Sequence, residues 1–95
     1  MRELKITPAA LADIQEGMDF YNSRTIGLGD SFETVIAAYI EAITEQPHAG
    51  TFYKEGVRYR VIRQFPFLIL YHFDDETIAV LRVFNTYQSP QLILI

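Results

Sequence analysis

The sequence predicts an α+β fold in which a helical hairpin packs on one face of a small antiparallel sheet, in the element order β-α-α-β-β-β. Two patterns indicate this fold. Apolar residues recur every three or four positions in residues 8–45, and they alternate with polar residues after position 50. Because the chain has 95 residues, we expect residues 1–95 to form a single domain with a modest core.

Residues 3–6 predict a short strand, and the residues after them predict a helix. Polar and apolar residues alternate in the first segment, as in a half-buried strand. The Thr7 hydroxyl can cap the helix, and Pro8 suits its first position because the missing N–H needs no partner there. The predicted apolar stripe of this helix is Ala10, Leu11, Ile14, Met18 and Tyr21. The opposite, solvated face carries Asp13, and the helix is expected to end near residues 22–23.

A second helix is predicted from Asp30 or Ser31 to Glu45. Either of the first two residues can cap it, and Pro47 ends it. Its apolar stripe is Phe32, Val35, Ile36, Tyr39, Ile40 and Ile43. A short loop joins the two helices, which predicts an antiparallel hairpin. Gly17 in the first helix predicts close packing against a neighbouring element, since glycine otherwise weakens a helix.

Three further strands follow. They are predicted over residues 57–62, 67–73 and 77–84. Asp74, Asp75 and Glu76 form a turn, so the strands that flank them are antiparallel. The first strand is expected to join this sheet, because alone it would leave its backbone groups unpaired. The sequence does not indicate which strand lies next to this first strand in the sheet.

The composition excludes several kinds of site. The chain has no cysteine and two histidines, which excludes a disulfide framework, a thiolate nucleophile and a cysteine-based metal centre. We therefore expect no metal and no cofactor. No apolar run approaches the roughly 20 residues that span a bilayer, and the N-terminus does not lead into a signal-peptide core. These features predict a cytoplasmic protein without a membrane partner.

The charge is unevenly distributed along the chain. The net charge of −4 divides into 3 − 8 = −5 for residues 1–50 and 5 − 4 = +1 for residues 51–95. A surface that binds anions is therefore expected in the second half. Direct binding of nucleic acid is not expected, because the pI is about 5.0 and domains that bind phosphates usually have a pI above about 9.

Arginines of the second half are the main candidate binding residues. They are Arg58, Arg60, Arg63 and Arg82. Arg58 and Arg60 are two positions apart on a strand, so they project from one face. If the apolar residues between them face the helices, these arginines lie on the open face of the sheet, where guanidinium groups suit phosphates or carboxylates. The alternative is a solvated sheet face on which the arginines pair with nearby carboxylates.

The polar loop after the last strand is a second candidate site. It contains Asn85, Tyr87 and Gln88, which could hold a ligand, and Tyr87 could stack on a nucleobase. The alternative is an ordinary loop with a half-buried aromatic side chain. His72 is interpreted as a histidine of the sheet and not as a catalytic base, because no motif places a partner beside it.

The chain ends in an apolar tail, residues 92–95, with the sequence Leu-Ile-Leu-Ile. Four consecutive apolar residues after a proline predict a strand that needs a partner. Two alternatives are open. The tail folds back onto the sheet, or it binds another chain by edge addition or as part of a homodimer.

Three segments carry a family resemblance. They are Arg63-Gln64-Phe65-Pro66-Phe67 within residues 57–71, then Val80-Leu81-Arg82-Val83-Phe84, and the early stretch from Thr7-Pro8 to Ile14. These segments and the order of elements resemble the RelE/ParE toxin superfamily of type II toxin–antitoxin systems, and the ParE-like branch in particular. The resemblance covers nearly the whole chain and implies the fold of that superfamily.

The resemblance also bears on activity. RelE-like members cut mRNA on the ribosome with basic residues of the sheet and of the last loop. Here Leu68 stands where those members place an arginine, and Asn85 and Gln88 stand where many relatives carry a histidine and an arginine. Amides neither transfer protons nor stabilise a developing dianion well. No catalytic residue is therefore assigned, and the resemblance implies a ParE-like toxin that inhibits growth by binding DNA gyrase.

The resemblance implies a cognate antitoxin as the main partner. A disordered acidic segment of the antitoxin is expected to bind Arg58, Arg60 and Arg82, and such pairs serve plasmid stabilization. Two alternatives are kept: a ribosome-dependent mRNA endoribonuclease of the RelE type, and a degenerate toxin that only binds its antitoxin.

Overall fold

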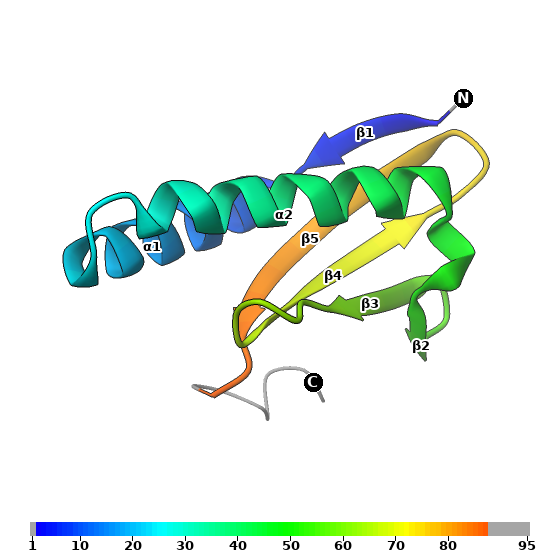
Figure 1. Cartoon of the computed structure of the whole chain (residues 1–95). Helices are drawn as coiled ribbons and strands as arrows, with labels where there is room; N and C mark the ends of the chain where they lie inside the picture. The colour runs from blue at the N-terminus through cyan, green and yellow to red at the C-terminus, as the bar shows by residue number, and fades with distance from the viewer. Residues whose placement is uncertain (1, 88–95) are drawn as a thin grey trace.

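Two helices lie side by side in one layer over a five-stranded sheet (Figure 1). The structure is a computed structural model in which residues 2–87 are described. The elements in chain order are β1 (Glu3–Ile6), α1 (Pro8–Arg24), α2 (Leu28–Glu45), the 3-10 turn η1 (Pro47–Ala49), β2 (Thr51–Lys54), β3 (Val57–Val61), β4 (Phe67–Phe73) and β5 (Thr77–Asn85).

The strands of the sheet lie in the order β1-β5-β4-β3-β2. The predicted α+β fold is confirmed, but the sheet is mixed and not wholly antiparallel. β1 runs parallel to β5, while the other neighbours are antiparallel. Only strands joined by a tight turn must be antiparallel, and β1 is separated from β5 by the rest of the fold. The sheet also has a strand that the sequence did not predict, β2, which joins β3 through a turn with Gly56 at φ 76°.

The start of α1 agrees with its predicted cap, and the start of α2 does not. The Thr7 hydroxyl accepts a hydrogen bond from the Ala10 backbone N–H at 3.1 Å. The N-cap of α2 is Gly27, at φ 85°, so this helix begins earlier than the predicted Asp30 or Ser31. A side chain from α1 replaces the missing cap, since Asn22 Oδ1 accepts from the Gly29 N–H at 2.7 Å.

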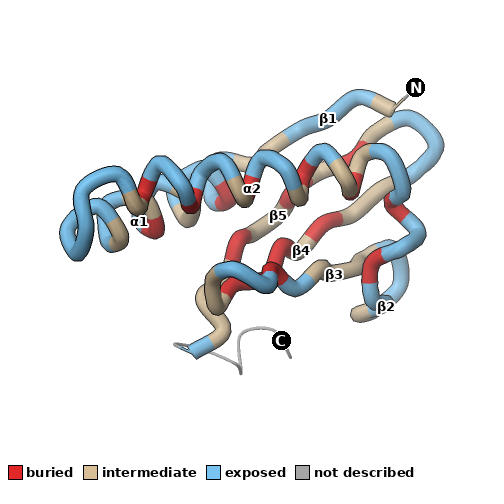
Figure 2. Tube along the Cα trace, viewed as in Figure 1, coloured by how far each residue is buried: buried red, intermediate tan, exposed pale blue. Residues whose placement is uncertain are grey.

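The main core lies between α2 and the two central strands, as the buried segments in Figure 2 show. Its members on the helix are the predicted Phe32, Ile36, Ile40 and Ile43, and those on the sheet are Phe67, Ile69, Tyr71, Ile78, Val80 and Val83. α1 buries much less: Ala10 and Gly17 are its buried residues. Leu11, predicted in the apolar stripe of this helix, is 54% exposed.

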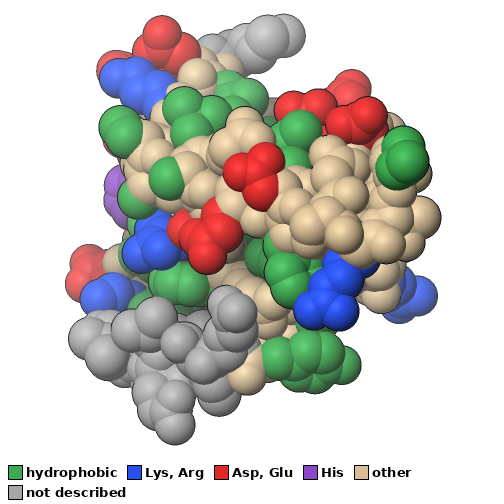
Figure 3. Space-filling view, turned by 90° about the vertical axis from the view of Figure 1, so that its left-hand side faces the viewer, with side chains coloured by type: hydrophobic (Ala, Val, Ile, Leu, Met, Phe, Trp, Pro, Cys, Tyr) green, Lys and Arg blue, Asp and Glu red, His purple; other side chains and the backbone are tan. Residues whose placement is uncertain are grey.

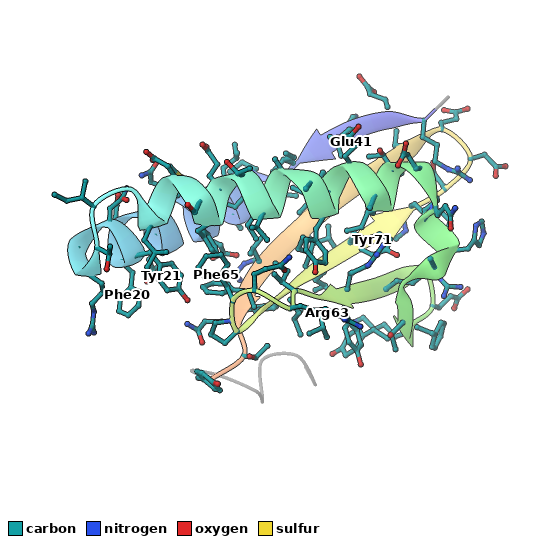
Figure 4. All side chains as sticks on the ribbon, in the orientation of Figure 1. Phe20, Tyr21, Glu41, Arg63, Phe65 and Tyr71 are labelled. Carbon is teal, nitrogen blue, oxygen red and sulfur yellow. The ribbon has the colours of Figure 1, made fainter. Side chains whose placement is uncertain are left out.

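Gly17 lies where the two helices pack closely, as predicted. A Cβ atom at this position would lie 2.6 Å from Cε2 of Phe32. The Phe32 ring is fully buried and packs with three other aromatic rings, from Tyr21, Phe65 and Phe67. Figure 4 shows Tyr21 and Phe65 pointing toward one another, and their ring centroids are 4.8 Å apart.

Candidate functional site

The candidate arginines of β3 lie on the side of the sheet that faces the helices. Residues paired across antiparallel strands project from the same face, and Arg58 pairs with Tyr71 while Arg60 pairs with Ile69. Both partners belong to the core under the helices, as does Ile62, two positions after Arg60. The prediction that these arginines occupy the open face is therefore wrong.

The position of β3 in the sheet explains this orientation. The main core forms over β4 and β5, and β3 lies beyond it toward the edge. Long side chains can there lay their methylene groups against the core while their guanidinium groups reach water. Arg58 and Arg60 are accordingly half-buried. We call these two residues the β3 arginine pair.

The β3 arginine pair makes no ion pair with the part of the chain that the structure describes. Within residues 2–87, the contacts between opposite charges at 4.0 Å or less are Lys5–Glu3 and Arg82–Asp13. Arg58 Nη1 donates to the Gly50 carbonyl at 3.0 Å. The Arg60 guanidinium lies 5.7 Å from the centroid of the Tyr39 ring on α2, which is within the range of a cation–π contact. The pair thus keeps most of its donors available to an anion.

Two tyrosine hydroxyls near the pair are already hydrogen-bonded. The buried Tyr71 hydroxyl donates to the Pro47 carbonyl at 2.7 Å. Burial raises the pKa of Tyr71, and the nearby Gly50 backbone and the two arginine charges offset part of that rise. The Tyr39 hydroxyl donates to Gln64 Oε1 at 3.0 Å and accepts from the backbone N–H of Arg63 at 3.3 Å. Neither hydroxyl is placed to accept a proton from a substrate.

Arg82 has a different role from the β3 arginine pair. Its Nε and Nη2 atoms donate to the two carboxylate oxygens of Asp13 on α1, at 2.7 and 2.9 Å. Asp13 Oδ2 also accepts from the backbone N–H of Val83 at 2.9 Å, and the guanidinium lies over the Phe84 ring. The hydrogen bonds to Asp13 raise the pKa of Arg82. Arg82 therefore ties the edge of β5 to α1 and does not join the other arginines.

Asp13 is the residue that sequence reasoning missed. The sequence places it on the solvated face of the first helix, but its side chain is only 14% exposed. β1 covers β5 over residues 77–80, so the N–H of Val83 lies beyond the end of that pairing. Asp13 supplies the missing acceptor. A signal was available, since Asp13 lies in the stretch from Thr7 to Ile14 that carries the family resemblance.

Three of the remaining predicted residues, Arg63, Asn85 and Tyr87, lie at the end of the sheet where β5 ends. An open hollow there is lined by Ile62, Arg63, Gln64, Phe65, Pro66, Thr86 and Tyr87. Asn85 Oδ1 accepts from the backbone N–H of Tyr87 at 2.9 Å and so shapes the loop. The Tyr87 side chain is 83% exposed. Arg63 and Tyr87 are thus brought together, whereas Gln88 and the apolar tail of residues 92–95 lie outside the described residues.

Three further features concern the surface of the described residues. On the face drawn in Figure 3, which looks onto the end of the helical hairpin, basic and acidic side chains are interspersed. Within residues 2–87, no group of three or more histidine, aspartate or glutamate side chains is arranged to hold a metal ion. Neither of the two helices described is long and apolar enough to cross a membrane.

Comparisons with known proteins agree with this fold. A family model described as the ParE toxin of the type II toxin–antitoxin system parDE matches residues 4–90. A search of curated proteins finds no match. Among solved structures, a chain of the chromosomal ParDE TA system from P. aeruginosa superposes with a TM-score of 0.79 at 21% identity, over 90% of this chain and 96% of that one. Because the family model spans almost the whole sequence, this chain belongs to the ParE toxin family of type II toxin–antitoxin systems.

Proposed function

We propose that this protein is a toxin that a cognate antitoxin neutralises, and that it acts by binding DNA gyrase without cleaving nucleic acid. The observation that carries the proposal is the β3 arginine pair. Its two residues are half-buried, lie on one face of one strand and have no carboxylate partner among the described residues. Such groups are ready to bind an anion.

An acidic segment of the antitoxin is the ligand that this site suits best. A carboxylate can take two parallel hydrogen bonds from one guanidinium, and partial burial strengthens them. Removing one member of a desolvated charge pair at an interface typically costs about 2–5 kcal/mol. A disordered acidic segment can reach both arginines along the edge of α2. This placement replaces the open sheet face as the expected contact surface.

The chemistry around the arginines favours binding over cleavage. Cutting a phosphodiester requires one group that takes a proton and another that returns it. The hydroxyls of Tyr39 and Tyr71 are engaged with protein partners. The His48 ring packs edge-on against Phe73, with centroids 4.8 Å apart. The two tyrosine hydroxyls near the arginine pair therefore already donate their protons to protein acceptors.

A pair of assays on the purified protein tests the proposal. We expect concentration-dependent loss of DNA supercoiling by purified gyrase, and intact mRNA in a translation reaction that contains the same amount of protein. Fragmented mRNA with unaffected supercoiling would establish the RelE-like endoribonuclease instead. Activity in neither assay, with antitoxin binding retained, would identify a degenerate toxin.

The antitoxin contact is tested separately with matched arginine variants. Arg60→Ala should weaken the binding of the cognate antitoxin about thirtyfold or more, which corresponds to the lower end of the loss expected for one charged hydrogen-bonded pair. Arg24→Ala is the control, because Arg24 is exposed at the end of α1 and stacks on Phe20. Titration calorimetry on both variants, with circular dichroism to check folding, gives the comparison. An equal loss of affinity in both variants would show that the arginine pair does not contact the antitoxin.

A further inference from the structure

Tyr39 on α2 contacts both the β3 arginine pair and the connection between β3 and β4. The centroid of its ring lies 5.7 Å from the guanidinium carbon of Arg60. Its hydroxyl donates to Gln64 Oε1 at 3.0 Å and accepts from the backbone N–H of Arg63 at 3.3 Å. The side chain is half-buried and packs against the main core. One side chain of the helical layer therefore meets both the arginine strand and the connection that follows it.

The Tyr39 ring is held at both ends. Its backbone belongs to α2, one residue before the buried Ile40. Its hydroxyl meets a connection that is itself closed by a hydrogen bond, since the Ile62 N–H donates to the Phe67 carbonyl at 2.9 Å. A ring fixed in this way has little freedom to swing away from β3, and it presents a constant surface to the arginine beside it.

The Arg60 guanidinium has this ring as its contact within the protein. Its side chain makes no hydrogen bond and no ion pair with residues 2–87, whereas the Arg58 side chain donates to the Gly50 carbonyl. The face of an aromatic ring attracts a cation electrostatically and does not use up its N–H donors as a hydrogen-bond acceptor would. The guanidinium is thus restrained while its donors stay available to a carboxylate.

We propose that Tyr39 is a positioning residue of the anion site, whose ring orders the Arg60 guanidinium before an antitoxin carboxylate binds. A long side chain that is already ordered loses less rotamer entropy on binding, which should strengthen the complex about three- to tenfold. The effect on affinity rests on the antitoxin contact proposed above, whereas the ordering of Arg60 does not. Two measurements therefore test the two parts separately.

The first measurement is made on the free protein, without antitoxin. Tyr39→Phe keeps the ring, and Tyr39→Leu removes it. Nitrogen relaxation at the arginine Nε groups reports their picosecond-to-nanosecond mobility. We expect Arg60 to become clearly more mobile in Tyr39→Leu and to change little in Tyr39→Phe. Arg82 is the internal reference, because its Nε donates to Asp13 at 2.7 Å and should be equally rigid in all three proteins. Equal mobility of Arg60 in both variants would overturn the inference.

The second measurement is titration calorimetry with the full-length cognate antitoxin. Tyr39→Leu should bind about three- to tenfold more weakly than Tyr39→Phe, and this difference should vanish when both also carry Arg60→Ala. A purely structural role of the ring would leave the difference unchanged, and that result would overturn the inference. If Arg60→Ala alone binds as tightly as the natural protein, the proposed antitoxin contact fails, and the relaxation measurement still decides whether Tyr39 orders Arg60. Circular dichroism checks that each variant is folded.

Discussion

At the scale of single residues, Asp13 joins α1 to β5 through its carboxylate. It holds Arg82 with two hydrogen bonds and the N–H of Val83 with a third. We expect Asp13→Ala to lower the free energy of unfolding by about 2 kcal/mol, because the N–H of Val83 loses its acceptor and Arg82 loses both hydrogen bonds. Arg82→Ala should cost about 1 kcal/mol, because the Asp13 side chain, which is 14% exposed, loses its charged partner but keeps the hydrogen bond from Val83. Urea unfolding of both variants measures the difference, and equal losses would contradict this assignment.

Tyr71 makes stability depend on pH in the alkaline range. Burial raises its pKa above the ordinary value of 10.0, so the folded state holds this proton more tightly than the unfolded state does. Its stabilising contribution is complete below about pH 10 and is lost as the pH rises through the folded pKa. Tyr71→Phe removes the hydrogen bond to Pro47, at a cost of about 1 kcal/mol, and also removes this pH dependence.

Urea unfolding near pH 8 and above pH 10 tests the prediction for Tyr71. The difference in unfolding free energy between the natural protein and Tyr71→Phe should shrink as the pH rises. The comparison between the two proteins cancels the titration of the other tyrosines. A difference that stays constant or grows with pH would mean that the Tyr71 proton is not held more tightly by folding.

At the scale of elements, the contact between α1 and α2 depends on the absence of a side chain at Gly17. Alanine there would improve helix propensity by about 1 kcal/mol, but its Cβ would meet the fully buried Phe32 ring at 2.6 Å. Overpacking typically costs about 1–3 kcal/mol. We therefore expect Gly17→Ala to be destabilising by about 1 kcal/mol in thermal or urea unfolding.

A double-mutant cycle distinguishes overpacking from a general helix effect. In a Phe32→Leu background the ring is gone, so Gly17→Ala should become neutral or stabilising. If Gly17→Ala costs the same in both backgrounds, Phe32 is not the cause. The aromatic rings around Phe32, from Tyr21, Phe65 and Phe67, leave it little room to move aside, which is why the cost is expected.

At the scale of the whole molecule, the distribution of charge sets the salt dependence of binding. The second half of the chain is the basic half, and the β3 arginine pair is its half-buried part. If an acidic antitoxin segment binds there, raising the salt concentration from about 0.05 to 0.5 M should weaken the complex, since salt screens exposed charges. The double variant Arg58→Ala, Arg60→Ala should show a clearly shallower dependence. A slope unchanged by the double variant would place the electrostatic contact elsewhere.

The two edges of the sheet are protected by different means. On one side, β1 covers the first part of β5, and Asp13 binds the next exposed amide. On the other side, the short strand β2 covers β3 from Val57 to Tyr59. Short edge strands and capped amides limit unwanted pairing with other chains.

The sequence alone determined the features that local interactions control. The types and order of the main elements, the Thr7 cap, the apolar stripe of α2, the turn after Asp74 and the close packing at Gly17 follow from spacing and residue chemistry. These patterns repeat over a few residues, so a chain of 95 residues is enough to show them.

Only the tertiary structure decided how those elements face one another. Alternation on β3 allows either of its faces to be the inner one. Arg58 and Arg60 face the helices because β3 lies at the margin of the core, where long side chains can still reach water. The direction of β1 and the pairing of Arg82 with Asp13 join residues more than sixty positions apart. No local pattern encodes such pairings, because they depend on which surfaces remain to be covered once the core has formed.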